Sequence, residues 1–200
     1  MDIRIRNPLS RREFLRLGCV TAAVVSLGGW LRFSSTGGDF LRPPGARAET
    51  EFLGRCLRCQ RCMEACPRKV IAPLPVVQGF AVGGTPTLDY RTDYCDLCGK
   101  CITACPSGAL QATDLNSAHL GVAVIVPDRC VAWNWGGCTV CSKKCPRRAI
   151  ALNENEQPVV DASVCNGCGL CESICPSASL RSYTGEQGHN KGIVVAPLPL

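Results

Sequence analysis

The stretch CLRCQRCMEACP, residues 56–67, has two residues between its first, second and third cysteines, three before the fourth, and a proline after it. The same order of cysteines returns three more times along the chain. The four sets are Cys56, Cys59, Cys62 and Cys66; Cys95, Cys98, Cys101 and Cys105; Cys130, Cys138, Cys141 and Cys145; and Cys165, Cys168, Cys171 and Cys175. Only the third set departs from the spacing, because seven residues separate Cys130 from Cys138. The chain is therefore built on a fourfold cysteine repeat.

Cysteine runs with this spacing are typical of proteins that hold 4Fe-4S clusters. Three cysteines two residues apart wrap a tight loop around three irons of one cube, and the fourth typically serves the other cluster of a pair. We expect the fourth cysteine at the start of a short helix, with the proline after it ending the loop. The sixteen cysteines of the four sets are therefore the candidate ligands, and they predict four 4Fe-4S clusters.

Two other uses of cysteine fit the sequence less well. Zinc sites usually combine separated CxxC pairs, often with histidine, whereas His119 and His189 both lie outside the cysteine runs. Disulfides suit exported chains, but the cysteines of a CxxCxxC run have poor geometry for pairing with one another. The seventeenth cysteine, Cys19, belongs to no set, and we interpret it as unligated.

The first 48 residues have the features of an export signal. SRREFL at 10–15 contains the twin arginines Arg11 and Arg12, and a modestly apolar stretch follows at 17–31. That stretch is short for a membrane span and typical of a signal-peptide core. The pattern predicts a twin-arginine signal. Because this route exports folded, cofactor-loaded protein, we expect a periplasmic, membrane-associated protein. ARA at 46–48 is a candidate cleavage site, and retention of the segment as a membrane anchor is the alternative.

Charge and composition exclude several classes of function. The formal net charge is +6 at pH 7, but residues 1–48 carry eight Lys or Arg against three Asp or Glu, which accounts for most of it. No basic face with interleaved aromatic residues is left for nucleic acid. The sequence also has no Ser/His/Asp set, phosphate loop or haem-attachment CxxCH, and four cysteines per cluster leave no open metal position for catalysis. The sequence favours an electron-transfer component over an enzyme acting on its own.

The fold class expected from the sequence is α+β, a ferredoxin-like build of two dicluster units with short β-hairpins and short helices. Short strands are expected at 69–77, 87–94, 109–113, 121–128, 149–152, 158–161 and 179–183. The fifth and sixth of these should form a hairpin around the turn at 153–156. Short helices are expected after each fourth cysteine. The chain is poor in aromatic side chains, so we expect clusters to stabilise the fold.

The sequence leaves two ways to pair the motifs. Tandem pairing joins the first with the second and the third with the fourth, whereas nested pairing joins the first with the fourth and the second with the third. The 28 residues between Cys66 and Cys95 look long for one dicluster unit. By analogy with four-cluster subunits of membrane-linked oxidoreductases, we favour the nested order. The predicted organisation is a signal and linker region, 1–48, a four-cluster region, 49–184, and a C-terminal tail, 185–200. Within the four-cluster region, 49–84 would pair with 153–184, leaving 85–152 as the inner unit.

Several blocks of sequence add a more specific signal to the cysteine motifs. They are RREFLR at 11–16, LRPPGA at 41–46, FLGRCLRCQRCMEACP at 52–67, CPSGAL at 105–110, CVAWNWGGCTVCSKKCP at 130–146 and GEQGH at 185–189. With these blocks the chain resembles the MauM/NapG family of ferredoxin-type periplasmic proteins, which are encoded with periplasmic nitrate reductase or methylamine dehydrogenase systems. The resemblance implies that electrons arrive from a membrane polyferredoxin or quinol oxidase of the NapH type and leave to a periplasmic redox enzyme.

Two other functions remain open from the sequence alone. One is a beta-type iron-sulfur subunit bound permanently to a molybdenum or tungsten oxidoreductase. The other is a maturation factor that helps to assemble a periplasmic redox enzyme.

The remaining conspicuous side chains are interpreted as structural. Trp133 and Trp135 lie in the enlarged third motif, where filling of the longer loop is favoured over a docking surface. We interpret the two histidines as solvated loop residues. Basic residues beside the motifs are interpreted as solvated surface charge; they are Arg58, Arg61, Lys143, Lys144, Arg147 and Arg148.

Overall fold

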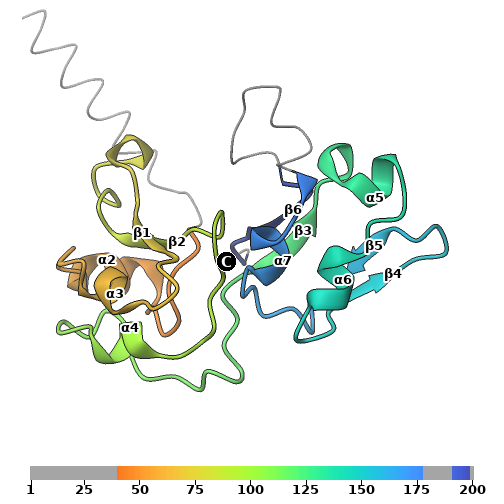
Figure 1. Ribbon diagram of the computed structural model, residues 1–200. Helices are drawn as coiled ribbons and strands as arrows, with labels where there is room; N and C mark the ends of the chain where they lie inside the picture. Colours follow the sequence, from red (N-terminus) through yellow and green to blue (C-terminus); the bar gives the residue numbers. More distant parts are fainter. Residues whose placement is uncertain (1–39, 178–190, 199–200) are drawn as a thin grey trace, which may run out of the picture.

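The computed structural model describes residues 40–177 and 191–198, which form two units lying side by side (Figure 1). We call 40–113 the first unit and 121–177 with 191–198 the second unit; the segment 114–120 joins them. The predicted signal at 10–31 and the expected strand at 179–183 lie outside the described residues. None of the helices in the described ranges is long and apolar enough to cross a membrane.

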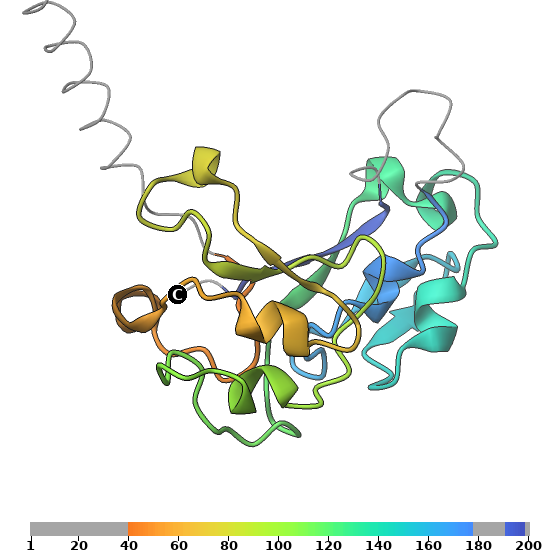
Figure 2. The same ribbon diagram turned by 60° about the vertical axis from the view of Figure 1, so that its left-hand side comes forward.

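The first unit contains the first two cysteine motifs and one β-hairpin. Its elements are α2 (Glu49–Arg55), α3 (Arg61–Ala65), β1 (Ile71–Pro73), the 3-10 helix η1 (Val76–Gln78), β2 (Pro86–Leu88) and α4 (Lys100–Thr103). β1 and β2 are antiparallel, with Ile71 opposite Leu88. Figure 2 shows α3 and α4, which carry cysteines of the two motifs, next to one another below this hairpin.

The second unit contains the last two motifs and two pairs of strands. Its elements are β3 (Val122–Ile125), the 3-10 helix η2 (Pro127–Arg129), α5 (Val131–Asn134), α6 (Val140–Lys144), β4 (Ile150–Leu152), β5 (Pro158–Val160), α7 (Leu170–Ser173) and β6 (Ile193–Ala196). The hairpin expected at 149–152 and 158–161 is confirmed, with Ile150 opposite Val160. In Figure 1, α7, β3 and β6 face the first unit, and the β4–β5 hairpin lies at the far end.

The C-terminal residues contribute a strand, whereas the sequence suggested a separate tail at 185–200. β6 pairs with β3 in antiparallel register, with Val122 opposite Ala196. Ile193 and Val195 alternate inward and are buried. The predicted boundary at 185 is therefore wrong for 193–196, because these residues complete the core of the second unit.

Residues 40–48 belong to the first unit, so the predicted boundary between 48 and 49 is wrong as a domain limit. Ala46 forms an isolated β-bridge with Leu110, which is all that forms of the strand expected at 109–113. The Arg42 guanidinium donates hydrogen bonds to Thr85 Oγ1 at 2.9 Å, to the Pro86 carbonyl at 2.7 Å and to Glu49 Oε2 at 2.9 Å. This segment precedes the first motif and pairs with a residue that follows the second motif, as β3 precedes the third motif and pairs with a strand that follows the fourth.

The cysteine-bearing helices end near the fourth cysteine, whereas the sequence suggested that they start there. Cys66 and Cys145 are the residues that cap the C-termini of α3 and α6, and Cys105 and Cys175 follow shortly after α4 and α7. The reason is the spacing: the third and fourth cysteines lie four residues apart, about one helical turn. The proline after the fourth cysteine then prevents the helix from continuing.

Candidate iron-sulfur cluster sites

Four small cavities in the described part of the chain are each lined by four cysteines. We call them site A (Cys56, Cys59, Cys62 and Cys105), site B (Cys66, Cys95, Cys98 and Cys101), site C (Cys145, Cys165, Cys168 and Cys171) and site D (Cys130, Cys138, Cys141 and Cys175). Every one of the sixteen motif cysteines lines one of these cavities. In each site three cysteines of one motif meet the fourth cysteine of its neighbour, which is the exchange that the spacing predicted.

This grouping is tandem, so the nested pairing favoured from the sequence is wrong. Motifs one and two share the first unit, and motifs three and four share the second. The 28-residue gap after Cys66 fits one unit because it folds back on itself. Leu74 N–H donates to the Thr85 carbonyl, and Gly84 N–H donates to the Leu74 carbonyl, both at 2.8 Å. The stretch 74–85 is thus an excursion from the β1–β2 hairpin, and its length does not separate the two motifs.

The loops around the middle cysteines share one backbone conformation in three of the four motifs. The residues directly before and after the middle cysteine have positive φ angles; they are Arg58 and Gln60, Leu97 and Gly99, and Gly167 and Gly169. A left-handed residue on each side turns the chain around the cysteine, so that three thiols of one motif line one cavity. Non-glycine residues in this conformation cost about 1 kcal/mol each. Arg58, Gln60 and Leu97 adopt this unfavourable conformation because the loops require it.

Backbone N–H groups point at several of the cysteine sulfurs. Leu110 N–H lies 3.5 Å from Cys105 Sγ, and Ala149 N–H lies 3.4 Å from Cys145 Sγ. Within the second unit, the N–H of Ala123 in β3 also lies 3.4 Å from Cys165 Sγ. Such hydrogen bonds stabilise negative charge on sulfur, and around iron-sulfur centres they adjust the reduction potential.

Burial makes several of the thiols poor acids on their own. It raises the pKa of Cys62 to about 11 and that of Cys101 to about 12, with charges of nearby cysteines adding to the effect. Cys105 differs from these: burial opposes ionisation there, but hydrogen bonds from Leu110 and Ser107 lower its pKa. Cys62 and Cys101 therefore need a positively charged partner to be held as thiolates, and the irons of a cluster would supply that charge.

The donor set of each site fits a 4Fe-4S cluster. Each cavity offers four cysteines and no histidine, as a cubane cluster requires. Within 40–177 and 191–198, no three His, Cys, Asp or Glu side chains are grouped around a single-ion position, as a tetrahedral zinc site would need.

Several of the other side chains singled out in the sequence lie within hydrogen-bonding distance of backbone carbonyl groups. Trp133 Nε1–H donates to the Pro158 carbonyl at 3.4 Å, so this ring packs on the β4–β5 hairpin, whereas Trp135 is 67% exposed. A ring nitrogen of His119, Nδ1, lies 3.1 Å from the Cys165 carbonyl oxygen. His189 is outside the described residues. Arg58 donates to the Ala81 carbonyl.

Sequence reasoning missed two buried residues near the cysteine sites. Tyr90 is 2% exposed and Lys191 is 6% exposed. Both form hydrogen bonds to residues distant in sequence. Tyr90 binds Gly167, which is 77 residues away, and Lys191 binds Glu172, which is 19 residues away. Tyr90 lies within the strand expected at 87–94, and Lys191 lies near the C-terminus. Neither residue belongs to a motif that would predict its burial. A basic residue in a stretch that is otherwise apolar, KGIVVAP at 191–197, was the one available hint.

Comparison with known domains agrees with the cysteine geometry. A 4Fe-4S dicluster domain matches residues 55–109, and a 4Fe-4S binding domain matches residues 158–181. The first match spans both motifs of the first unit as one dicluster domain. It therefore supports tandem pairing independently of the cavities.

Comparison with whole proteins finds relatives over most of the chain. The methylamine utilization ferredoxin-type protein MauM of Methylophilus methylotrophus is 38% identical over 202 residues, covering 92% of this chain and 88% of the relative. The ferredoxin-type protein NapG of Escherichia coli K12 is 34% identical over 209 residues, covering 90% of each. A MauM protein of Paracoccus denitrificans is 33% identical over 190 residues, covering 85% of this chain and 84% of the relative.

Proposed function

Because the chain belongs to the MauM/NapG family of ferredoxin-type proteins, we propose that it is an electron-transfer protein with four 4Fe-4S clusters. In this role it relays electrons from a membrane quinol-oxidising partner of the NapH type to a periplasmic redox enzyme. The acceptor is a reductase or dehydrogenase system of the kind that the family serves.

One observation carries the proposal: all sixteen motif cysteines line cavities, four to a cavity. Each set has the composition of a complete cubane ligand sphere. A complete sphere leaves no coordination position for a substrate, so the chemistry supplied at each site is one-electron storage and exchange. The cysteines hold the group, the surrounding N–H groups stabilise its charge, and burial limits access of water.

The surface exposure of the middle cysteines suits exchange with partners. Cys59 of site A and Cys98 of site B are exposed, whereas Cys101 of site B and Cys171 of site C are buried. An edge open to the surface permits close approach of a redox partner. Burial of the other thiols limits the access of water to the sites.

Export through the twin-arginine route is part of the proposal. The support is the SRREFL sequence at 10–15 with the short apolar stretch at 17–31. Replacing Arg11→Lys and Arg12→Lys together should trap the protein in the cytoplasm, because the route reads this pair. Fractionation followed by immunodetection measures this, and unchanged periplasmic accumulation would contradict the route.

Electron donation is tested with the full chain, purified anaerobically and added to membranes that contain a NapH-type partner and a reduced quinol. The expected result is reduction of the clusters, seen as loss of their visible absorbance. Membranes without that partner are the control. Equal reduction by both membranes, or no reduction by either, would overturn the proposed donor.

A further inference from the structure

The two units meet through a direct hydrogen bond between two cluster loops. The backbone N–H of Cys95 donates to the backbone carbonyl of Cys168 at 2.8 Å. Cys95 lines site B in the first unit, and Cys168 lines site C in the second. A continuous path therefore runs from one thiol to the other through two cysteine backbones and one hydrogen bond.

Tyr90 holds the loop around Cys168 from both sides. Its hydroxyl donates to the carbonyl of Gly167 at 2.8 Å, and the whole residue is only 2% exposed. Its ring packs against Gly169 so closely that a Cβ atom there would lie 2.2 Å from ring carbons. Gly167 and Gly169 are the two residues on either side of Cys168. A side chain of the first unit thus fits into the loop of site C.

Burial raises the pKa of Tyr90, with the charges of Cys95 and Cys168 adding to the effect. The phenol therefore stays protonated and keeps its role as a donor to Gly167.

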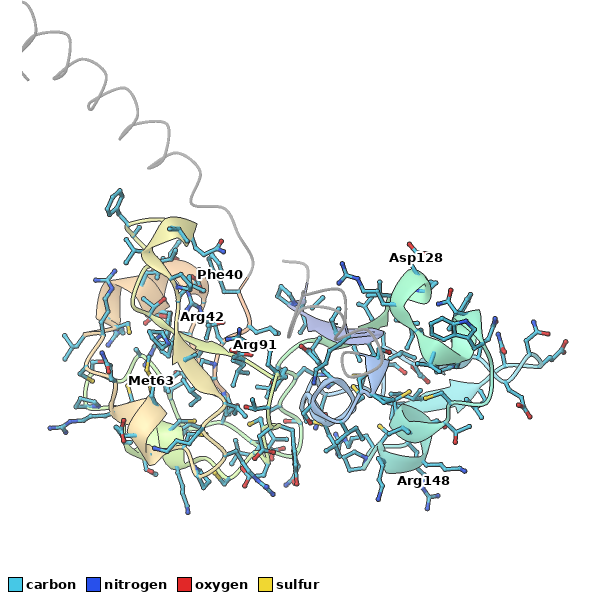
Figure 3. The ribbon with its side chains drawn as sticks, turned by 45° about the horizontal axis from the view of Figure 1, so that its top comes forward. Phe40, Arg42, Met63, Arg91, Asp128 and Arg148 are labelled. Atoms are coloured by element: carbon cyan, nitrogen blue, oxygen red, sulfur yellow. The ribbon has the colours of Figure 1, made fainter. Side chains whose placement is uncertain are left out.

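Lys191 adds a second clamp next to Tyr90. Its Nζ donates to the carbonyls of Arg91 at 3.0 Å, Glu172 at 2.7 Å and Ser173 at 2.9 Å. These three acceptors match the three N–H donors of an ammonium group. Arg91 follows Tyr90 in the first unit, and Figure 3 shows it between the two units. Glu172 and Ser173 belong to α7, so Lys191 also stabilises the contact between the two units, which we call the joint.

Within each unit the two sites are neighbours as well. α3 packs on α4 and α6 packs on α7. At α3, Cys62 of site A and Cys66 of site B lie about one helical turn apart, which places site A beside site B. At α6, Cys141 of site D and Cys145 of site C are separated in the same way, which places site D beside site C. The sites therefore follow one another in the order A, B, C, D.

We propose that Tyr90 is a positioning residue that sets the contact between sites B and C, and so joins the two dicluster units into one series. This inference rests on the proposed function, because it requires clusters at both sites. Bound clusters would supply one-electron exchange at the joint: the donor cluster is oxidised by one electron as the acceptor is reduced, and no bond or proton changes. The ends of the series are then site A and site D.

The chain offers a matched pair of glycine substitutions to test the joint. Gly169→Ala adds a methyl group where the Tyr90 ring lies, at a residue with φ of +83°. Gly136→Ala adds the same group at φ of +76°, where nothing lies within 4 Å. Both variants carry similar backbone strain, so a difference between them reports the packing against Tyr90. Tyr90→Phe adds no atom and removes only the hydroxyl that binds Gly167.

The readout is magnetic coupling between clusters in the full chain, measured by low-temperature EPR after complete reduction by dithionite, with iron counted in each sample. Dipolar coupling falls with the cube of the distance, so separation of the units removes the contribution across the joint and leaves that within each unit. We expect Gly169→Ala to lose this contribution, whereas Gly136→Ala keeps the wild-type spectrum. Tyr90→Phe should weaken the coupling and speed hydrogen exchange at the Cys95 amide.

Full iron with wild-type coupling in Gly169→Ala would overturn the inference and leave the proposed function intact. If Gly169→Ala loses iron, Tyr90→Phe decides: wild-type coupling and wild-type exchange at Cys95 would overturn the inference. Few irons in the wild-type protein would contradict the proposed function, and the inference would fall with it.

Discussion

Cys62 and Cys66 lie about one helical turn apart at α3, yet they line different cavities. Cys62 lines site A together with Cys105, whereas Cys66 lines site B together with Cys98. The same exchange occurs at α6, where Cys141 lines site D and Cys145 lines site C. Each short helix therefore connects the two sites of its unit, and the loss of the fourth cysteine of a motif acts on the site of the neighbouring motif.

Double substitutions test this exchange. Cys66→Ala and Cys98→Ala both remove a ligand from site B, so the double variant should lose one cluster, about four irons per chain. Cys62→Ala combined with Cys98→Ala removes one ligand from site A and one from site B. This variant should lose two clusters, about eight irons per chain. The measurement is iron per chain after anaerobic purification. Equal losses from the two double variants would contradict the assignment of Cys66 to site B.

Arg42→Met should destabilise the first unit. The guanidinium is largely buried, binds Glu49, Thr85 and the Pro86 carbonyl, and lies 4.7 Å from the centre of the Phe52 ring. Loss of these hydrogen bonds should reduce the free energy of unfolding by about 2–3 kcal/mol. The loss of visible cluster absorbance during denaturant unfolding measures this.

The control for that variant is Arg55→Met, because Arg55 forms a half-exposed ion pair with Glu51 on α2. Such pairs contribute less than about 1 kcal/mol. If Arg42→Met proved no more harmful than Arg55→Met, residues 40–48 would not have the structural role described here.

Lys191→Met should loosen the closing strand of the second unit. The substitution leaves the carbonyls of Glu172 and Ser173 without the ammonium and removes a cation beside a partly buried carboxylate. Since Glu172 Oε2 also accepts the Val195 N–H at 2.7 Å, β6 should lose protection. Hydrogen exchange of 193–196 is the measurement, and the expected result is faster exchange. Lys143→Met, at an exposed position of α6, should leave exchange unchanged; equal behaviour of the two variants would count against the clamp.

Removal of the clusters should unfold both units. Buried aromatic residues are few, with Phe52 and Tyr90 the largest fully buried side chains in the described ranges, and ligand binding by thiolates supplies folding energy. Iron extraction by a chelator under reducing conditions, followed by circular dichroism and thermal scans, tests this. A cooperative thermal transition that survives iron removal would show that the polypeptide core suffices.

The cysteines that line the four cavities could be picked out from the sequence because their spacing is local, but their grouping could not. Whether Cys66 meets Cys95 depends on how the 28 residues between them fold, and the excursion at 74–85 is closed by hydrogen bonds that have no sequence signature. Strand β6 pairs with β3 across about 70 residues of chain, a contact that periodicity does not reveal.

The position of the helices was open to inference and was still placed wrongly. Four residues from the third to the fourth cysteine, with proline next, already define one helical turn that ends at the fourth cysteine. By contrast, the fit of Tyr90 between Gly167 and Gly169 is purely tertiary. It could be found only once the two units were placed together.

The central claim is that sixteen cysteines hold four cubane clusters. The most direct test is the amount of iron and acid-labile sulfide in the full chain, purified without oxygen. We predict about sixteen of each per chain, and no stoichiometric zinc. About eight irons, or zinc in place of iron, would contradict the account.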